Sequence, residues 1–554
     1  MKKNSAMAPF KSTDFTVIWG ASVISTIGVR MHEVGAAWYM TTMTDDPFIV
    51  ALVQAATTLP IFLFALLAGA IADNFSKRKM LLVVNIIMAV LAAILALLAC
   101  FNIMTPYMLL LFIFLMSSFA AFSVPPKQAI NPLLVPKEDL SAAISMNSIG
   151  FNISRSIGPA IAGILIVALG PESPFVINAL SFIAVIWAFM WWRPTNAKSH
   201  EPKHKESISR SIKAGLRYAR YSQPLRATLW RAFAFFISAS GFWALLPIFV
   251  KTEMQAGANV YGLLVAAIGL GAVIGAFLLP KAKKKLSSDQ ITWIAAAFII
   301  APMMFTAFPA NNTLFTYLFP TWPVDEILAV MGSITFGIAW MWTLSTFSVS
   351  AQGALPDWVR ARGLAIYLMV FFGSMSVGSI IWGAIATNMG IKTALIISSV
   401  TLTLGMILSR KQKLNLGEAV DLAPSENWAE PNILVKTEQD KGLLNERSPV
   451  MIMIEYNLAP ENIDKFLSMM CQLQEARKQY GAYGWEVLQQ SDKSDVFVEC
   501  FFDVSWIDYL THSERQAGKD QVLEQQIHAL LKEGEKPVIK HFLGPQGLGS
   551  HTNC

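Results

Sequence analysis

GAIADNFSKRK, residues 69–79, closes a long apolar segment with three consecutive cations, and this combination indicates the fold class. The stretch GAFLLPKAKKK, residues 275–285, has a glycine and three cations at the same offsets. A second match places Phe-Ser-Val at 122–124 and again at 347–349. Because both matches keep one register, the sequence predicts a duplicated unit of membrane helices.

The composition also indicates a membrane protein. Of the 554 residues, 54% are hydrophobic and only 14% are charged, whereas soluble domains are about 25% charged. A spanning helix needs roughly 20 mainly apolar residues. Twelve segments meet this need, at about 15–42, 48–72, 80–101, 106–124, 141–168, 174–192, 225–250, 258–279, 289–309, 325–347, 361–387 and 392–409.

The distribution of positive charge predicts the orientation. If the segments alternate in direction, the loops on one side of the membrane carry only Lys251 and Lys392, and the loops on the other side carry all the cations given below. Cytoplasmic loops are enriched in Lys and Arg, so we expect a multi-pass protein of the bacterial plasma (inner) membrane with both termini in the cytoplasm. The inner set of cations comprises those within residues 2–11, 77–79, 127–137, 193–220, 281–285, 360–362 and 410–413.

The chain divides into five predicted parts. The linker between the halves places Ile208, Ile212, Leu216 and Ala219 at helical spacing among basic residues, which is typical of an amphipathic helix on the inner leaflet; a solvated basic linker is the alternative. The parts are a first six-helix half (1–192), the cytoplasmic linker (193–224), a second six-helix half (225–413), a flexible linker (414–448) and a soluble domain (449–545).

The soluble part, residues 449–545, is predicted to form a small α+β domain. VMIMIEYNL alternates like a strand, and the following segment is an amphipathic helix opened by Pro460. Two strands, a second helix and a last strand, PVIKHFL, complete the order βαββαβ. That order fits a ferredoxin-like fold.

The loop at 69–79 resembles the signature G-x-x-x-D-x-x-x-[RK]-[RK] of the major facilitator superfamily. Asn74 and Ser76 depart from its commoner form, and the second half has Leu279 at the acidic position. The resemblance implies that the acidic residue helps to lock a cytoplasmic gate; a simple positively charged loop is the alternative. The residues that carry this gate motif are Gly69, Asp73, Lys77, Arg78 and Lys79.

The segment GFNISRSIGPAIAG, residues 150–163, resembles the Gly-Pro motif of drug and proton antiporters in the same superfamily. Ala162 stands where that family often has a second glycine. The motif implies an exporter, although a Gly-Pro kink that serves only helix packing remains an alternative. Its residues are Gly150, Gly158, Pro159 and Gly163, with Arg155 beside them.

Charged residues inside membrane helices are costly and tend to be functional. Arg30 and Glu33 are three residues apart, hence on one helix face and able to pair. We assign Glu33 as the candidate for proton coupling, with Arg30 tuning its proton affinity; a structural ion pair is the alternative. Arg155 either pairs with a carboxylate or bridges helices.

A substrate cavity is predicted at the tenth segment, from Asp325, Phe336 and Trp340. Aromatic side chains there would suit planar substrates. The alternatives are a helix N-terminus that favours an acid and ordinary aromatic packing.

The C-terminal domain resembles that of the transmembrane secretion effectors, an exporter subfamily whose membrane part is similar to enterobactin exporters. Domains of this type resemble small monooxygenases that pair through their sheets, so an enzyme with His512 or Trp485 at its pocket, or a dimerising sensor, is an alternative role. The matching residues are Arg477, Gly481, Ala482, Trp485, Glu499, Trp506, His512 and Arg515.

The sequence therefore predicts a membrane transporter and no enzyme. It shows no P-loop, Rossmann fingerprint, metal-ligand motif or nucleophile elbow, so we expect no catalytic residues, no metal and no cofactor. The expected partners are a small-molecule substrate, protons, lipid and a second copy through the C-terminal domain, with no nucleic acid. We expect export of a siderophore-like metabolite or a drug by proton antiport, with a broad multidrug pump as the alternative.

Overall fold

The computed structural model describes residues 7–74, 76–193, 208–307, 324–356, 358–414, 449–506, 508–510, 518–532 and 534–543. The chain forms two compact units. The first unit comprises Met1–Lys205, Thr228–Val349 and Tyr367–Leu414, and the second comprises Glu206–Ala227, Ser350–Ile366 and Asn415–Cys554.

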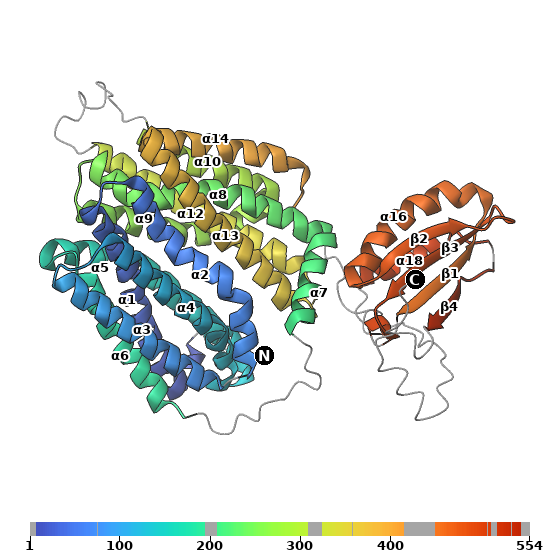
Figure 1. Cartoon of the computed structure of the whole chain (residues 1–554), viewed down its shortest axis with the longest axis horizontal. Coiled ribbons are helices and arrows are strands. Elements are labelled where there is room, and N and C mark those ends of the chain that lie inside the picture. The colour runs from blue at the N-terminus through green and yellow to red at the C-terminus, as the bar shows by residue number, and fades with distance from the viewer. Residues whose placement is uncertain are drawn as a thin grey trace, which may run out of the picture. The chain divides into compact units, whose positions relative to one another are not determined.

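The first unit is a bundle of long helices in two halves (Figure 1). Each segment predicted to span the membrane corresponds to one of these helices. The first half contains α1 (Thr13–Met43), α2 (Pro47–Asn74), α3 (Lys77–Cys100), α4 (Pro106–Leu134), α5 (Leu140–Leu169) and α6 (Ser173–Trp191). The second half contains α8 (Gln223–Thr252), α9 (Ala258–Lys285), α10 (Ser288–Ala307), α12 (Val324–Gly353), α13 (Arg360–Met389) and α14 (Ile391–Leu408).

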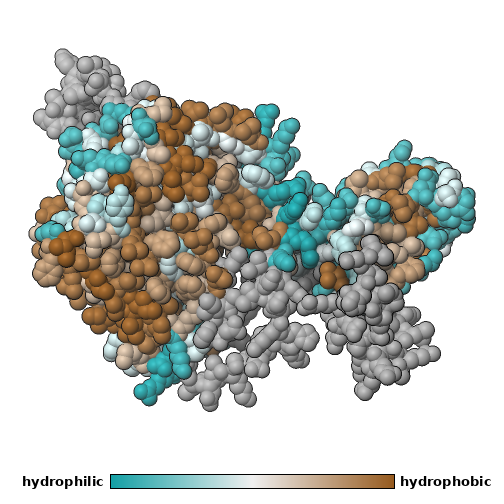
Figure 2. Space-filling view, viewed as in Figure 1, coloured by the Kyte–Doolittle hydropathy of each residue, from teal (hydrophilic) through white to brown (hydrophobic). Residues whose placement is uncertain are grey.

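Ten helices within the described residues are long and apolar enough to cross a membrane. The helix α1 is not among them, because Arg30, His32 and Glu33 interrupt its apolar sequence. In α10 the apolar stretch, Ser288–Met304, is short. Apolar residues cover most of the visible face of the bundle (Figure 2), as expected for a surface that faces lipid.

The two ends of the bundle differ in charge. We name the end that holds residues 77–79 and 281–285 the basic end. The other end, which holds the loop between α1 and α2, is named the Asp45 end. Successive helices run between these two ends, so that α1 rises to the Asp45 end and α2 returns.

The helix α4 is longer than the sequence predicted. It continues to Leu134, whereas the prediction ended at Val124, before Pro125 and Pro126. Proline is tolerated in membrane helices because neighbouring groups and local adjustments satisfy the freed backbone. The prolines therefore did not end this helix.

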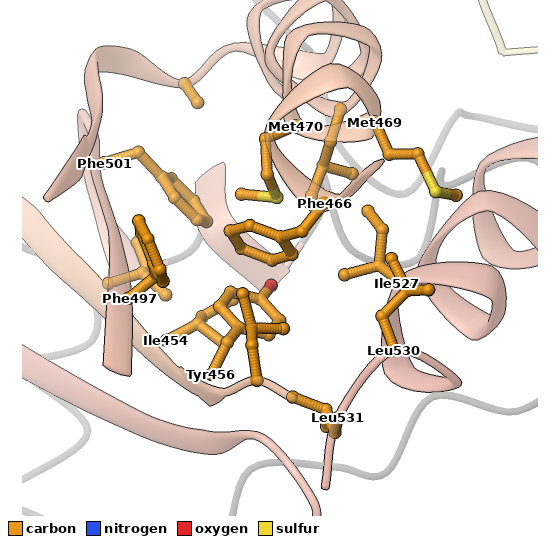
Figure 3. Close-up of a cluster of buried hydrophobic side chains, with 14 of the residues drawn as sticks. Ile454, Tyr456, Phe466, Met469, Met470, Phe497, Phe501, Ile527, Leu530 and Leu531 are labelled. Atoms are coloured by element: carbon orange, nitrogen blue, oxygen red, sulfur yellow. The ribbon is translucent and has the colours of Figure 1, made fainter. Parts of the chain in front are cut away.

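The C-terminal part of the second unit has the predicted βαββαβ order. Its four strands form one antiparallel sheet in the order β2-β3-β1-β4. Side chains of both helices pack on one face of the sheet around Tyr456 and Phe466 (Figure 3). The elements are β1 (Val450–Asn457), α16 (Ile463–Tyr480), β2 (Tyr483–Gln489), β3 (Val496–Asp503), α18 (Gly518–His528) and β4 (Val538–Leu543).

The rest of the second unit packs on α16. The linker helix α7 (Ile208–Tyr221) donates a hydrogen bond from Arg217 Nη2 to the carbonyl of Tyr480, at 2.9 Å. The Tyr218 hydroxyl donates to the carbonyl of Ala354, also at 2.9 Å. The ring of Trp358 contacts both Tyr218 and Tyr480, with centroids 5.8 and 6.2 Å apart. This unit thus joins α7, the α12–α13 connection and the C-terminal domain.

The linker helix was predicted correctly, but its apolar face was predicted only in part. Ala219, assigned to that face, is buried, whereas Leu216, also assigned to it, is 52% exposed, and Tyr218, which was not assigned to it, is buried. Burial raises the pKa of the Tyr218 phenol above its usual value. The difference arises because the residues that cover α7 come from segments distant in the sequence.

Candidate functional site

Helices α5 and α1 approach closely at Gly158. A Cβ atom at this position would lie 2.7 Å from Cβ of Arg30, and so only glycine allows the contact. One turn further, Gly163 meets Gly262 of α9, where an added Cβ would lie 3.0 Å from the Gly262 Cα. The Gly-Pro motif therefore brings α5 against both α1 and the second half.

The interior of α1 carries the predicted ion pair. Arg30 Nη1 donates to Glu33 Oε2 at 2.6 Å, and the two side chains remain 26% and 35% exposed. The Arg30 guanidinium lies over the ring of Phe151 of α5, 5.2 Å from its centroid. Arg30 Nε is buried without a hydrogen-bond partner in the described part of the chain.

Arg155 lies beside this pair. It is three residues before Gly158 and four after Phe151, so all three share one face of α5. The charges of Arg30 and Glu33 both act on Arg155. Arg155 itself is half-buried, so part of its surface stays exposed.

The gate motif is described only in part. The backbone at Gly69 and Asp73 belongs to the last turns of α2, but their side chains lie outside the described residues. Arg78 donates from Nε to the carbonyl of Phe189 and from Nη2 to that of Met190, each at 2.8 Å. Arg78 therefore caps the C-terminus of α6, while Lys79 is exposed and Lys77 is half-buried. Their role in a gate stays a prediction.

The two halves are bonded to each other at the Asp45 end. Lys251 of α8 pairs with Asp45 at 2.7 Å and also donates to the carbonyl of Thr41. Thr387 of α13 donates to Asp46 Oδ1 at 2.6 Å. These bonds join loops and helix ends from opposite halves.

Contacts between the halves become weaker toward the basic end. Ser156 of α5 packs against Gly269 of α9, with the added Cβ of Gly269 2.9 Å from the Ser156 Cα. Two and three turns nearer the basic end, Ser148 and Ser145 are exposed. The bonds and close contacts described between the halves thus lie at the Asp45 end and near the middle of α5.

The predicted cavity residues on α12 have another setting. Phe336 is fully buried and Trp340 is 4% exposed. Phe336 stacks on Phe242 with ring centroids 4.4 Å apart, and Trp340 packs against Trp243. These rings form an aromatic core of the second half in this conformation, and lining of a cavity stays a prediction. The side chain of Asp325 lies outside the described residues.

Comparison with known proteins gives the family. The profile described as "Transmembrane secretion effector" matches residues 4–547, almost the whole chain. The chain belongs to this family. It is a multi-pass membrane protein and an efflux transporter of the major facilitator superfamily.

Two relatives and one solved structure match 72–74% of this secretion effector. The "Staphyloferrin A transporter" of Staphylococcus aureus (strain NCTC 8325 / PS 47) is 24% identical and covers 72% of this chain and 98% of its own. The "Multidrug efflux pump Tap" of Mycolicibacterium fortuitum is 22% identical, over 74% and 99%. The crystal structure of the nucleoside transporter NupG aligns with a TM-score of 0.57 at 12% identity, over 72% and 99%, and so shares the fold.

The C-terminal domain of the secretion effector contains a buried charge network. Glu499 is fully buried and accepts hydrogen bonds from Tyr456, Trp485 and Arg477 at 2.9, 2.8 and 3.1 Å. Burial alone would lower the pKa of Arg477, but the carboxylates of Glu499 and Glu524 raise it well above its usual value. The donors of Trp485 and Tyr456 are thus engaged inside the domain, which favours a structural role over catalysis.

Several functional candidates lie outside the sequence predictions. Lys251 and Asp45 were not singled out as functional residues, because only the assembled halves bring them together.

His512 and Arg515, which the sequence analysis named, lie outside the described residues. No group of three or more potential metal ligands occurs within the part of the chain that the structure describes.

Proposed function

We propose that this efflux transporter carries a small organic molecule, a siderophore-like metabolite or a drug, out of the bacterial cell by alternating access. The observation that carries this proposal is the asymmetry between the bundle ends. Bonds between the halves lie at the Asp45 end, and Arg155 lies beside the close contact of Ser156 with Gly269, whereas Ser148 and Ser145, nearer the basic end, are exposed. A conformation open toward the basic end would load substrate from that side.

The basic end is, in this proposal, the cytoplasmic end. Its cations satisfy the positive-inside rule, and α1 and α10 complete twelve spans with both termini inside. The proposed division remains 1–192, 193–224, 225–413, 414–448 and 449–545. Tagged termini that were protected from protease in intact cells and cleaved in opened cells would agree with this orientation.

Glu33 is the proposed proton carrier. Its carboxylate is half-buried, is held by Arg30 and lies within the electrostatic reach of Arg155 and Tyr261. Proton entry from outside would drive export, and Asp73 with residues 77–79 would control the cytoplasmic gate.

The test of proton coupling compares Glu33→Gln with Glu253→Gln in everted vesicles. Glu253 pairs with Lys392 at 2.7 Å within the second half and serves as the matched control. We expect Glu33→Gln to abolish export that depends on a pH gradient and Glu253→Gln to retain it. Normal proton-driven export by Glu33→Gln would remove Glu33 from this role.

The substrate is sought by mass spectrometry of medium and cells from a deletion strain and its parent, grown with little and with ample iron. One chelator retained inside the deletion strain would favour a siderophore exporter. Retention of many unrelated drugs, measured with dyes and antibiotics, would favour the multidrug alternative. The names of two relatives, a staphyloferrin A transporter and a multidrug efflux pump, support the two arms of this test.

We also propose that two copies of the chain pair through the C-terminal sheet. The face opposite the helices exposes Tyr483, Leu488 and Phe542 by 45%, 52% and 46%, and apolar faces of this kind favour association. Light scattering of the purified full chain would give a dimer mass, and Phe542→Glu would give a monomer. A monomeric wild-type protein would refute the pairing.

A further inference from the structure

The interior of the first half carries more positive than negative charge. Arg30 and Arg155 lie inside α1 and α5 with a single carboxylate, Glu33, between them. In the sequence, the remaining acids of this half stand at helix ends or in loops: Asp14, Asp45, Asp46, Asp73, Glu138, Asp139 and Glu172.

The available bonds leave donor groups unused. Glu33 engages one Arg30 nitrogen, and Arg30 Nε is buried without a partner among the described residues. No hydrogen bond or ion pair reaches the Arg155 side chain from the described part of the chain. An unpaired guanidinium at membrane depth is costly, and such groups tend to mark a substrate pathway.

Geometry directs these donors to one place. Arg30 is fixed against α5 by the contact of its Cβ with Gly158 and by the ring of Phe151. Arg155 projects from that same face of α5, between Phe151 and Gly158. Both arginines keep part of their surface exposed.

We infer that Arg30 and Arg155 bind an anionic group, a carboxylate, on the exported molecule. A guanidinium presents a planar fork that matches a carboxylate with two parallel hydrogen bonds. A carboxylate beside the two arginines and the ionised Glu33 leaves the cluster of these three residues neutral. The ring of Phe151 offers an apolar surface for the adjoining part of the molecule.

The inference deepens the proposed export function and does not depend on proton coupling. The carboxylate of the substrate and that of Glu33 share Arg30, so removal of the Glu33 charge strengthens anion binding. A cationic substrate is repelled by the positive charges of Arg30 and Arg155 and is excluded from this site. Outward movement of an anion is also favoured by an interior-negative membrane potential.

The test measures binding to the purified full chain by titration calorimetry. The probes are salicylate and salicylamide, which have the same ring and differ in charge. We expect salicylate to bind at least roughly tenfold more tightly, as for a hydrogen-bonded charged group. Arg155→Gln should reduce the affinity for salicylate to that for salicylamide, and Arg155→Lys should retain part of the preference for salicylate. Glu33→Gln should increase the affinity for salicylate.

Equal binding of the two probes, or binding of neither, would overturn the inference, as would an unchanged preference in a folded Arg155→Gln protein. Monodispersity and the melting temperature establish that each variant is folded. Transport of salicylate in vesicles separates the two proposals: binding without transport contradicts export, and transport with no charge preference contradicts the anion site.

Discussion

Replacement of Lys251 by alanine should open the Asp45 end of the bundle. Lys251 ties α8 of the second half to Asp45 and Thr41 of the first half. The Lys251 and Asp45 side chains are 34% and 78% exposed, so solvent screening limits their ion pair to about 0.2–1 kcal/mol. The hydrogen bond to the Thr41 carbonyl adds about 0.5–1.5 kcal/mol. A loss of about 1–2 kcal/mol raises the open population roughly 5- to 30-fold.

The assay follows a cysteine placed where the halves meet. Ala258 lies beside Gly163 and is 5% exposed. A cysteine introduced there by Ala258→Cys becomes accessible only when the two halves separate at the Asp45 end. With Cys100 replaced by Ser, the rate of labelling by an impermeant maleimide from the Asp45 side reports the open population. The matched control is Lys392→Ala, because Lys392 pairs with Glu253 inside the second half.

We expect Lys251→Ala to accelerate labelling roughly 5- to 30-fold and Lys392→Ala to leave the labelling rate unchanged. Equal rates in Lys251→Ala and the parent would show that these bonds do not hold the end closed. An equal acceleration by Lys392→Ala would show a general loosening and would also refute the reasoning.

Three further predictions concern packing and the C-terminal domain. Arg477→Met leaves Glu499 buried without its cation and should destabilise the domain by about 3–5 kcal/mol, measured by hydrogen exchange of β3, while the exposed Lys540→Met should have little effect. Gly158→Val should lower the thermal stability by about 1–3 kcal/mol through overpacking, whereas Gly20→Val meets no atom within 4 Å of its Cβ; similar melting of both variants would contradict this. Burial lowers the pKa of His541, so its contribution to stability is present above about pH 6.5 and is lost as the pH falls toward the folded-state pKa. His541→Gln should therefore weaken the acid dependence of the domain's melting temperature, and an unchanged dependence would refute it.

The sequence predicted helices wherever apolar length alone decides the structure. It failed where partners come from distant segments. Tyr218 is buried by residues around Ala354 and Trp358, so no periodicity within α7 could identify its inner face. Lys251 and Asp45 are 206 residues apart and form a pair only after both halves assemble.

The candidate site was partly predictable for a similar reason. The spacing of Arg30 and Glu33 indicated an ion pair because a helix places residues three apart on one face, and the structure contains it. The position of Arg155 beside that pair depends on the close packing at Gly158, which the Gly-Pro motif suggests but does not locate. For Phe336 and Trp340, spacing left both cavity lining and the commoner aromatic packing open; in this conformation the surrounding rings bury both.

The bond between Arg217 and Tyr480 also sets a waiting time during synthesis. These residues are 263 positions apart, and a ribosome adds roughly 5–20 residues per second. The helix α7 therefore leaves the ribosome roughly 13 to 50 seconds before the residues that cover it. During this interval Arg217 of the amphipathic helix has no Tyr480 carbonyl to bond, and a lipid surface or a chaperone is available to bind this side of the helix first.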